Sequence, residues 1–289
     1  MTKRPPLRKS LFTIISLVLV LFVLIFVYAP ILWLVLSSIS TRADLLAVPL
    51  HWIPAHPTLD NYLAILVPGR ALSEVSRTFK ICLRNSLLVA LSTTTICLLV
   101  GSLAAYALAR LYLPFKNTVL TSIMSVRMIP EMSLVIPMFI VTAFLSLINK
   151  PEILVVTYLS FALPYAVWML TTFFERVPIE LDNAAQIDGC SRLGTLFRVV
   201  LPVAVPGVIS TALFIFLSAW DEFFFALIFT STVASKTVPV AIAEFTGRYA
   251  VDITGMMTAG VVAALPPVIM SLVFQRYIVS GLSAGAVKG

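Results

Sequence analysis

Four ionisable residues lie within or beside long apolar stretches of the chain. Arg127 and Glu131 are four positions apart with a proline between them, so on one helix they would share a face and could pair. Asp221 and Glu222 are adjacent and follow Trp220. Ionisable groups inside a membrane are costly and usually face a cavity or a partner. These five residues form a candidate substrate path; the alternative is that they bond helices together or contact a partner subunit.

Other reactive residue types are few and poorly placed for chemistry. The sequence has no G-x-x-x-x-G-K-[ST] phosphate loop and no H-E-x-x-H. Both histidines, His51 and His56, lie in a proline-rich segment. The three cysteines, Cys82, Cys97 and Cys190, are widely spaced and are interpreted as small apolar fillers. We therefore expect no catalytic residue, no metal site and no cofactor bound by this chain.

The composition is that of a protein that crosses a membrane several times. Of 289 residues, 60% are hydrophobic and 11% are charged, against roughly 25% charged in soluble domains. A membrane-spanning helix needs about 20 mostly apolar residues. Six runs reach that length: 10–41, 85–109, 117–149, 153–174, 199–220 and 253–275. The sequence predicts an all-α membrane protein with six transmembrane helices.

Basic residues favour an orientation with both termini in the cytoplasm, because Lys and Arg mostly mark cytoplasmic ends. The net charge of +7 is therefore weak evidence for nucleic acid, and none is expected as a partner.

The first apolar run, at 10–41, is too long for a signal-peptide core and is interpreted as a retained span. The expected organisation is a cytoplasmic N-terminus at 1–10, a first span at 11–36, an extracytoplasmic loop at 37–80, a five-helix core at 81–278 that includes a polar island at 176–205, and a cytoplasmic tail at 279–289.

The polar island at 176–205 is predicted to form two short helices outside the lipid. Pro178 suits a first helical turn, where its missing N–H would be unpaired anyway. Gly189 can adopt the left-handed conformation that ends a helix, and Ser191 can cap the next one. Pro202 should end the second helix. This helix–turn–helix pattern is typical of a compact docking element.

The first helix of the island has residue types suited to docking in a groove. Ala184 and Ala185 would give a flat surface that a partner can approach. Glu180 and Asp188 are eight residues apart, so they lie near one face and could meet basic groups across an interface. The alternative is an ordinary interhelical loop.

Several motifs in order along the chain resemble one family of transporters. The stretch E-L-D-N-A-A-Q-I-D-G-C-S followed by F-R-V-V-L-P resembles the E-A-A loop of bacterial ABC-importer permeases, in the version of their carbohydrate-uptake branch. Supporting pieces are N-Y at 61–62, N-S-L at 85–87, A-A-Y-A-L-A-R at 104–110, M-I-P-E at 128–131, W-D-E-F at 220–223, F-Q-R-Y at 274–277 and G-L-S-A-G-A-V-K-G at 281–289. The resemblance is closest to the six-span maltose/trehalose-type permease.

The resemblance implies a type I ABC importer permease with cytoplasmic coupling helices. Such a subunit moves a carbohydrate, such as maltose or trehalose, into the cytoplasm across a bacterial plasma membrane. The implied partners are a second permease, two ATPase subunits that bind ATP and Mg, an extracytoplasmic solute-binding protein and membrane lipid. In this setting Trp220 could stack on a sugar ring, although in the maltose system most sugar contacts come from the partner permease.

The resemblance also assigns the docking residues. The E-A-A helix would seat in a groove on the ATPase subunit through Glu180, Asn183, Ala184, Ala185, Asp188 and Gly189, and the tail that holds Lys288 would reach the ATPase dimer interface. Two positions depart from the family pattern. Asn183 stands where the family has Glu, which puts a carboxylate-dependent contact there in doubt, and W-D-E-F replaces W-N-E-F.

Two other classes of protein were weighed against this interpretation. A secondary ion-coupled transporter could use Arg127, Glu131, Asp221 and Glu222 as its relay, but it predicts internal inverted repeats, which the sequence does not show. It also gives no role to the polar island. An intramembrane enzyme would need a nucleophile and a base within the spans, and neither histidine lies there.

Overall fold

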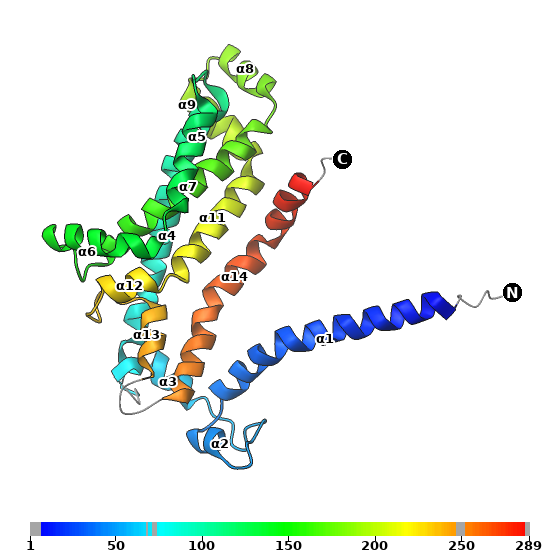
Figure 1. Cartoon of the computed structure of the whole chain (residues 1–289), viewed down its shortest axis with the longest axis vertical. Helices are drawn as coiled ribbons and strands as arrows, with labels where there is room; N and C mark the ends of the chain where they lie inside the picture. Colours follow the sequence, from blue (N-terminus) through cyan, green and yellow to red (C-terminus); the bar gives the residue numbers. More distant parts are fainter. Residues whose placement is uncertain (1–6, 68, 71–73, 247–251, 287–289) are drawn as a thin grey trace. The chain divides into compact units, whose positions relative to one another are not determined.

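The computed structural model describes residues 7–67, 69–70, 74–246 and 252–286. The chain is helical: α1 (Leu7–Ser38), α2 (Arg42–Leu46), α3 (Asp60–Leu66), α4 (Glu74–Arg110), α5 (Lys116–Ser125), η1 (Val126–Met128), η2 (Glu131–Leu134), α6 (Val135–Phe144), α7 (Pro151–Glu175), α8 (Ile179–Ile187), α9 (Arg192–Thr195), η3 (Leu196–Val200), α10 (Leu201–Val203), α11 (Val205–Trp220), α12 (Phe224–Phe229), α13 (Val238–Glu244) and α14 (Ile253–Ala286) (Figure 1).

Among the described residues, four helices are long and apolar enough to span a membrane: α1, α4, α7 and α14. Two bent pairs also pass this test, Lys116–Met128 with Glu131–Phe144 and Arg192–Val203 with Val205–Trp220. The count reaches the predicted six if each bent pair is one span. Helix α4 begins at Glu74, before the predicted apolar run at 85–109, because polar residues extend the same helix beyond its apolar part.

The first bent pair overturns one expectation about Arg127 and Glu131. The two arms meet at 83° around Pro130. Proline disfavours the α-helical conformation of the residue before it, and Ile129 is accordingly extended, with ψ 123°. Arg127 therefore belongs to η1 and Glu131 to η2. The prediction that they share one helix face is wrong.

The second bent pair joins the polar island to the next span. Its arms meet at 84°, and the break is at Ala204, with φ −86° and ψ 9°. A π-turn over Leu196–Val200 precedes Pro202. The helix ends at Val203, one residue after Pro202, so the predicted end at Pro202 is confirmed to within one residue.

Two compact units divide the chain: Met1–Arg77 with Glu244–Val262, and Thr78–Ala243 with Ala263–Gly289. In the first unit, the Asn61 side-chain amide donates to the carbonyl oxygens of Ser38 and Ser40, at 3.0 Å each. The Thr258 hydroxyl donates to the same Ser38 carbonyl at 3.1 Å. Thr41 and Asp44 form a capping box at the start of α2. These polar contacts tie the end of α1 to α3 and α14.

The second unit is a close-packed bundle around α4, α7 and α11. A Cβ added at Gly101 would lie 3.2 Å from the Ala166 Cβ, and one at Gly207 would lie 2.1 Å from the Phe173 ring. A side chain at Gly207 would overlap the Phe173 ring, and one at Gly101 would press on Ala166, so both glycines favour close packing of the helices. Ala105 on α4 is also fully buried.

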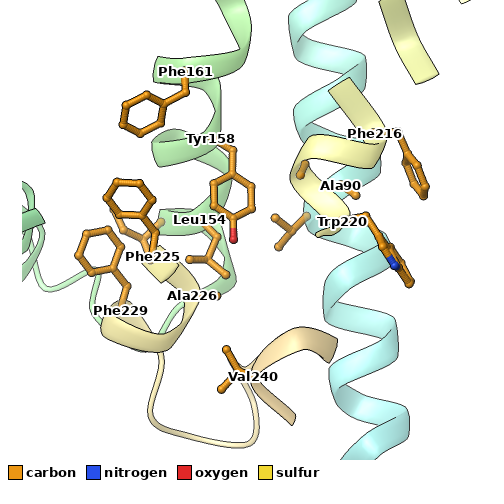
Figure 2. Close-up of a cluster of buried hydrophobic side chains, with 13 residues drawn as sticks. Ala90, Leu154, Tyr158, Phe161, Phe216, Trp220, Phe225, Ala226, Phe229 and Val240 are labelled. Atoms are coloured by element: carbon orange, nitrogen blue, oxygen red, sulfur yellow. The ribbon is translucent and has the colours of Figure 1, made fainter. Parts of the chain in front are cut away.

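An aromatic core fills the bundle beside the α12 turn. Figure 2 shows Tyr158 and Phe161 of α7 and Phe225 and Phe229 of α12 on one side, with Trp220 of α11 on the other. Phe161 and Phe225 stack with ring centroids 5.3 Å apart. In the second unit, α8 and α9 lie at one end of the bundle, and α12 and α13 lie towards the opposite end (Figure 1).

Candidate functional site

The polar island forms the predicted helix–turn–helix. Pro178 is the N-cap of α8, one position before the predicted first turn. Gly189 adopts the left-handed conformation, with φ +85°. The Ser191 hydroxyl accepts a hydrogen bond from the Gly194 amide at 3.1 Å and so caps α9. The structure confirms the predicted roles of Gly189 and Ser191.

Helix α8 has one exposed face and one buried face. The predicted docking residues Glu180, Asn183, Ala184, Asp188 and Gly189 are all exposed. Ala185, in contrast, is buried with 7% exposure, because one residue turns a helix by about 100°. The two alanines therefore do not form one flat surface: Ala184 faces outward and Ala185 faces the bundle.

The buried face of α8 carries an acid that sequence reasoning missed. Asp182 is 2% exposed, and one of its carboxylate oxygens accepts a hydrogen bond from the Tyr106 hydroxyl at 3.2 Å. Its other oxygen lies 3.3 Å from Nε of Arg110 in an ion pair that lacks hydrogen-bond geometry. Arg110 also donates through Nη2 to the Val177 carbonyl at 2.6 Å. The last turn of α4 thus holds α8 in place.

Large apolar side chains border the exposed face of the island. Ile187 is 86% exposed at the end of α8, and Leu193 and Phe197 are more than half exposed on the next helical segment. Exposed apolar groups next to polar ones are typical of protein interaction sites. The exposed face of the island can thus accept a partner through both apolar burial and hydrogen bonds.

A pocket in the second unit gathers three of the predicted substrate-path residues. It has a volume of about 210 Å³, and its walls come from α7, α11, the α12 turn and the break between η1 and η2. Arg127, Glu131 and Glu222 all line it, together with Tyr158 and Tyr165. The chain therefore brings two acids, a guanidinium and two phenols around one space, although the acids are distant in sequence.

The charged groups of the pocket differ in how their hydrogen bonds are satisfied. The Glu222 carboxylate accepts from the Tyr158 hydroxyl at 2.6 Å and from the amides of Phe225 and Ala226, at 2.9 and 3.2 Å. It therefore caps α12. Arg127 donates to the Phe161 carbonyl at 2.9 Å. The Glu131 carboxylate has neither an ion pair nor a hydrogen bond within the part of the chain that the structure describes.

The remaining predicted residues lie elsewhere. Trp220 is 3% exposed and stacks on Phe216, with ring centroids 5.7 Å apart, so it is part of the core and does not line the pocket. Figure 2 shows its ring on the far side of α11 from Tyr158. Asp221 is exposed and also outside the pocket. Lys288 lies outside the described residues.

Aromatic side chains supply the apolar part of the pocket. Tyr165 and Phe214 stack face to face, with ring centroids 4.0 Å apart, and both line the space. The sequence analysis passed over Tyr158 and Tyr165 because they sit in an apolar run without a motif. Their spacing of seven residues, two helical turns, was the one signal that they share a face of α7.

Several apolar helices long enough to span a membrane, a polar pocket in the second unit and a polar helix pair at one end of that unit are features of a multi-span membrane protein. A solved structure of a bacterial ABC transporter that imports the acidic polysaccharide alginate contains a chain with this fold, with a TM-score of 0.81, 18% identity, and coverage of 96% of this chain and 100% of that one. This likeness establishes the fold of an ABC importer permease.

Residues 97–284 match the family described as binding-protein-dependent transport system inner membrane component. The sulfoquinovosyl glycerol transport system permease protein SmoH of Agrobacterium fabrum is 40% identical over 260 residues, which is 90% of this chain and 88% of that protein. The trehalose/maltose transport system permease protein MalG of Thermococcus litoralis is 36% identical over 99% of both chains. The chain belongs to the binding-protein-dependent transport system inner membrane component family.

Proposed function

We propose that this chain is the membrane permease subunit of an ATP-driven importer that brings a carbohydrate into a bacterial cell. Its relatives include permeases named for sulfoquinovosyl glycerol, for trehalose and maltose, and for trehalose alone. A di- or oligosaccharide of the maltose or trehalose type is the proposed substrate. Both termini are placed in the cytoplasm, and the extracytoplasmic partner is a solute-binding protein.

The exposed face of α8 is the proposed seat of an ATPase subunit, and this is the observation that carries the proposal. Asn183 and Ala184 point away from the bundle, and Gly189 turns the chain sharply into α9. An exposed helix face next to exposed apolar side chains suits helix-in-groove recognition. ATP and Mg would be bound by two ATPase subunits, so hydrolysis is assigned to those partners and no catalytic residue to this chain.

The pocket is the proposed contribution of this chain to the substrate path. Its volume is about 210 Å³, and a partner subunit would have to enlarge it to the about 300 Å³ or more that is usual for ligand pockets. Glu131 and Arg127 offer an acceptor and donors for hydroxyl groups, and Tyr165 with Phe214 offers apolar surface for a ring face. Trp220 is left out of this assignment because its ring is buried in the core. A second permease subunit would complete the path.

Reconstitution into liposomes tests the proposal. The chain is assembled with its second permease and ATPase subunits, and uptake of labelled trehalose and maltose is measured with binding protein outside and ATP inside. ATP-dependent uptake is expected, and Gly189→Pro should abolish it in complexes whose assembly is verified separately. Uptake by the purified chain alone, driven by an ion gradient without an ATPase, would instead establish the secondary transporter.

Site-specific photocrosslinking tests the docking face directly. A photoreactive residue at Ala184 should crosslink to the ATPase subunit in the assembled complex. The same residue at Val156, which is 55% exposed on α7, is the matched control and should not crosslink to the ATPase. Equal yields at the two positions would remove α8 as the docking site.

A further inference from the structure

Helix α8 is joined to the bundle by the chain on both sides and by side-chain contacts with α4. The short turn of Arg176–Pro178 leads back to α7, and the turn after α8 leads into α9 and η3, against which α8 also packs. Asp182 contacts Tyr106 and Arg110, which lie 76 and 72 positions earlier in the chain on α4. This contact reaches a span to which α8 is not covalently adjacent, so it can carry motion that the two turns alone do not.

Burial distinguishes this contact from an ordinary surface ion pair. The side chains of Arg110 and Asp182 are 5% and 2% exposed. Lys116 and Glu175 form an ion pair at 2.5 Å between α5 and α7, but their side chains are 30% and 45% exposed. Water screens the second pair and hardly reaches the first, so the buried pair fixes its partners more firmly.

The guanidinium of Arg110 contacts both the turn before α8 and α8 itself. Its Nη2 donates to the Val177 carbonyl at 2.6 Å, and its Nε lies 3.3 Å from the Asp182 carboxylate. Tyr106, one turn earlier on α4, donates to the other oxygen of the same carboxylate. Rotation of α8 about its axis, or its displacement away from α4, must therefore break contacts with at least one of these groups.

We infer that Tyr106, Arg110 and Asp182 form a latch that passes displacements of α8 directly to α4. This inference rests on the proposed function, in which an ATPase subunit moves α8. The three side chains touch neither ATP nor sugar and are positioning residues. With the latch closed, α8 and the last turn of α4 move as one body; with it broken, α8 can follow the ATPase while α4 lags behind.

The coupling between hydrolysis and transport is the first readout. In the reconstituted importer, Asp182→Asn and Tyr106→Phe should raise the number of ATP molecules hydrolysed per sugar imported by about fivefold or more, the lower end of ordinary coupling between sites. Glu175→Gln, which opens the exposed ion pair at the same end of the bundle, is the matched control and should leave the ratio unchanged. A merely structural role would lower the amount of assembled complex without changing its ratio.

A distance within the chain is the second readout and does not depend on transport. Spin labels at the exposed positions Asn183 and Leu103 report the separation of α8 from α4. Asp182→Asn should broaden the distance distribution, and Glu175→Gln should not. Unchanged distributions and an unchanged ATP-to-sugar ratio would overturn the latch. If wild-type complexes show no ATP-dependent uptake, the proposed function fails, while the distance measurement still decides whether the latch holds α8.

Discussion

The buried contact of Asp182 with Tyr106 and Arg110, called the α8 anchor below, and the pocket both place charged side chains among apolar helices. The two regions differ in whether these charged groups have partners within the chain. At the anchor, Asp182 faces Arg110 and Tyr106 and is almost fully enclosed. In the pocket, Arg127 and Glu131 line an open space, and Glu131 has no partner in the part of the chain that is described. Charges whose partners lie within the chain stabilise its fold, whereas charges left open can bind something else.

Glu222 combines the two situations: it lines the pocket, and it also has hydrogen-bond partners within the chain. Its carboxylate lines the pocket, yet it accepts from Tyr158 and from the Phe225 and Ala226 amides. The bonds to α12 are structural, as at the anchor. The comparison therefore predicts large losses of stability at the anchor, intermediate losses at Glu222 and almost none at Glu131.

Asp182→Ala should cause the largest loss. It leaves the Arg110 guanidinium buried without its counter-ion, and removing one member of a buried pair typically costs about 3–5 kcal/mol. Thermal or denaturant unfolding of the detergent-purified chain measures the change. Glu175→Gln, in the exposed pair with Lys116, should cost no more than about 1 kcal/mol. Similar losses for both variants would show that burial does not separate the two pairs.

Glu222→Ala should cause an intermediate loss. It removes the acceptor for the Tyr158 hydroxyl and for two amides of α12, and a buried donor without a partner costs about 1–3 kcal/mol. The same unfolding measurement applies. Asp221→Ala is the matched control, because this adjacent acid is exposed and should change the free energy of unfolding by less than about 0.5 kcal/mol. The prediction fails if the two neighbours cannot be told apart.

Glu131→Gln should leave stability almost unchanged while it impairs transport. Because the carboxylate has no partner among the described residues, its removal should shift the free energy of unfolding by no more than about 0.5 kcal/mol. If Glu131 accepts a sugar hydroxyl, the KM for sugar uptake should rise with ATPase activity per complex retained. A loss of stability without any change in KM would show that Glu131 stabilises the fold and does not bind the sugar.

The smallest effect is expected outside both regions, at the capping box of α2. Hydrogen bonds from Thr41 lower the pKa of the Asp44 carboxyl below its ordinary value of 3.8. Because the folded pKa is the lower one, the stabilisation is complete above pH 3.8 and is lost as the pH falls through the folded value. Amide hydrogen exchange at residues 41–46 should therefore accelerate in that acidic range. Thr41→Val should raise exchange at neutral pH and weaken this pH dependence, because it removes hydrogen bonds that lower the folded pKa.

The sequence was sufficient for features that depend on neighbouring residues. Six apolar runs gave the six spans, once each bent pair is taken as one span. Gly189 and Ser191 were predicted correctly because a left-handed turn and an N-cap each depend on a few adjacent positions. The exposed position of Asn183 and Ala184 also follows from the local pattern of α8.

The sequence was insufficient to predict side-chain positions that depend on backbone bends or on contacts between residues distant in the chain. Helical spacing placed Arg127 and Glu131 on one face, but Pro130 breaks the helix between them, and only the pocket brings them together. Asp182 looked like one more polar residue of the island because its partners Tyr106 and Arg110 are more than 70 positions away. Trp220 was a candidate for either the substrate path or a structural role, and the sequence did not distinguish them; the structure places its ring in the core.

The 84° bend at Ala204 has a mechanical consequence. Its arms, Arg192–Val203 and Val205–Trp220, are about 18 Å and about 24 Å long at 1.5 Å per residue. If the bend keeps its angle and pivots at Ala204, it turns motion of one arm into nearly perpendicular motion of the other. The arm lengths would then convert each ångström at Arg192 into about 1.3 Å at Trp220, two residues from Ser218 in the pocket wall. The longer arm would in that case enlarge the displacement as well as redirect it.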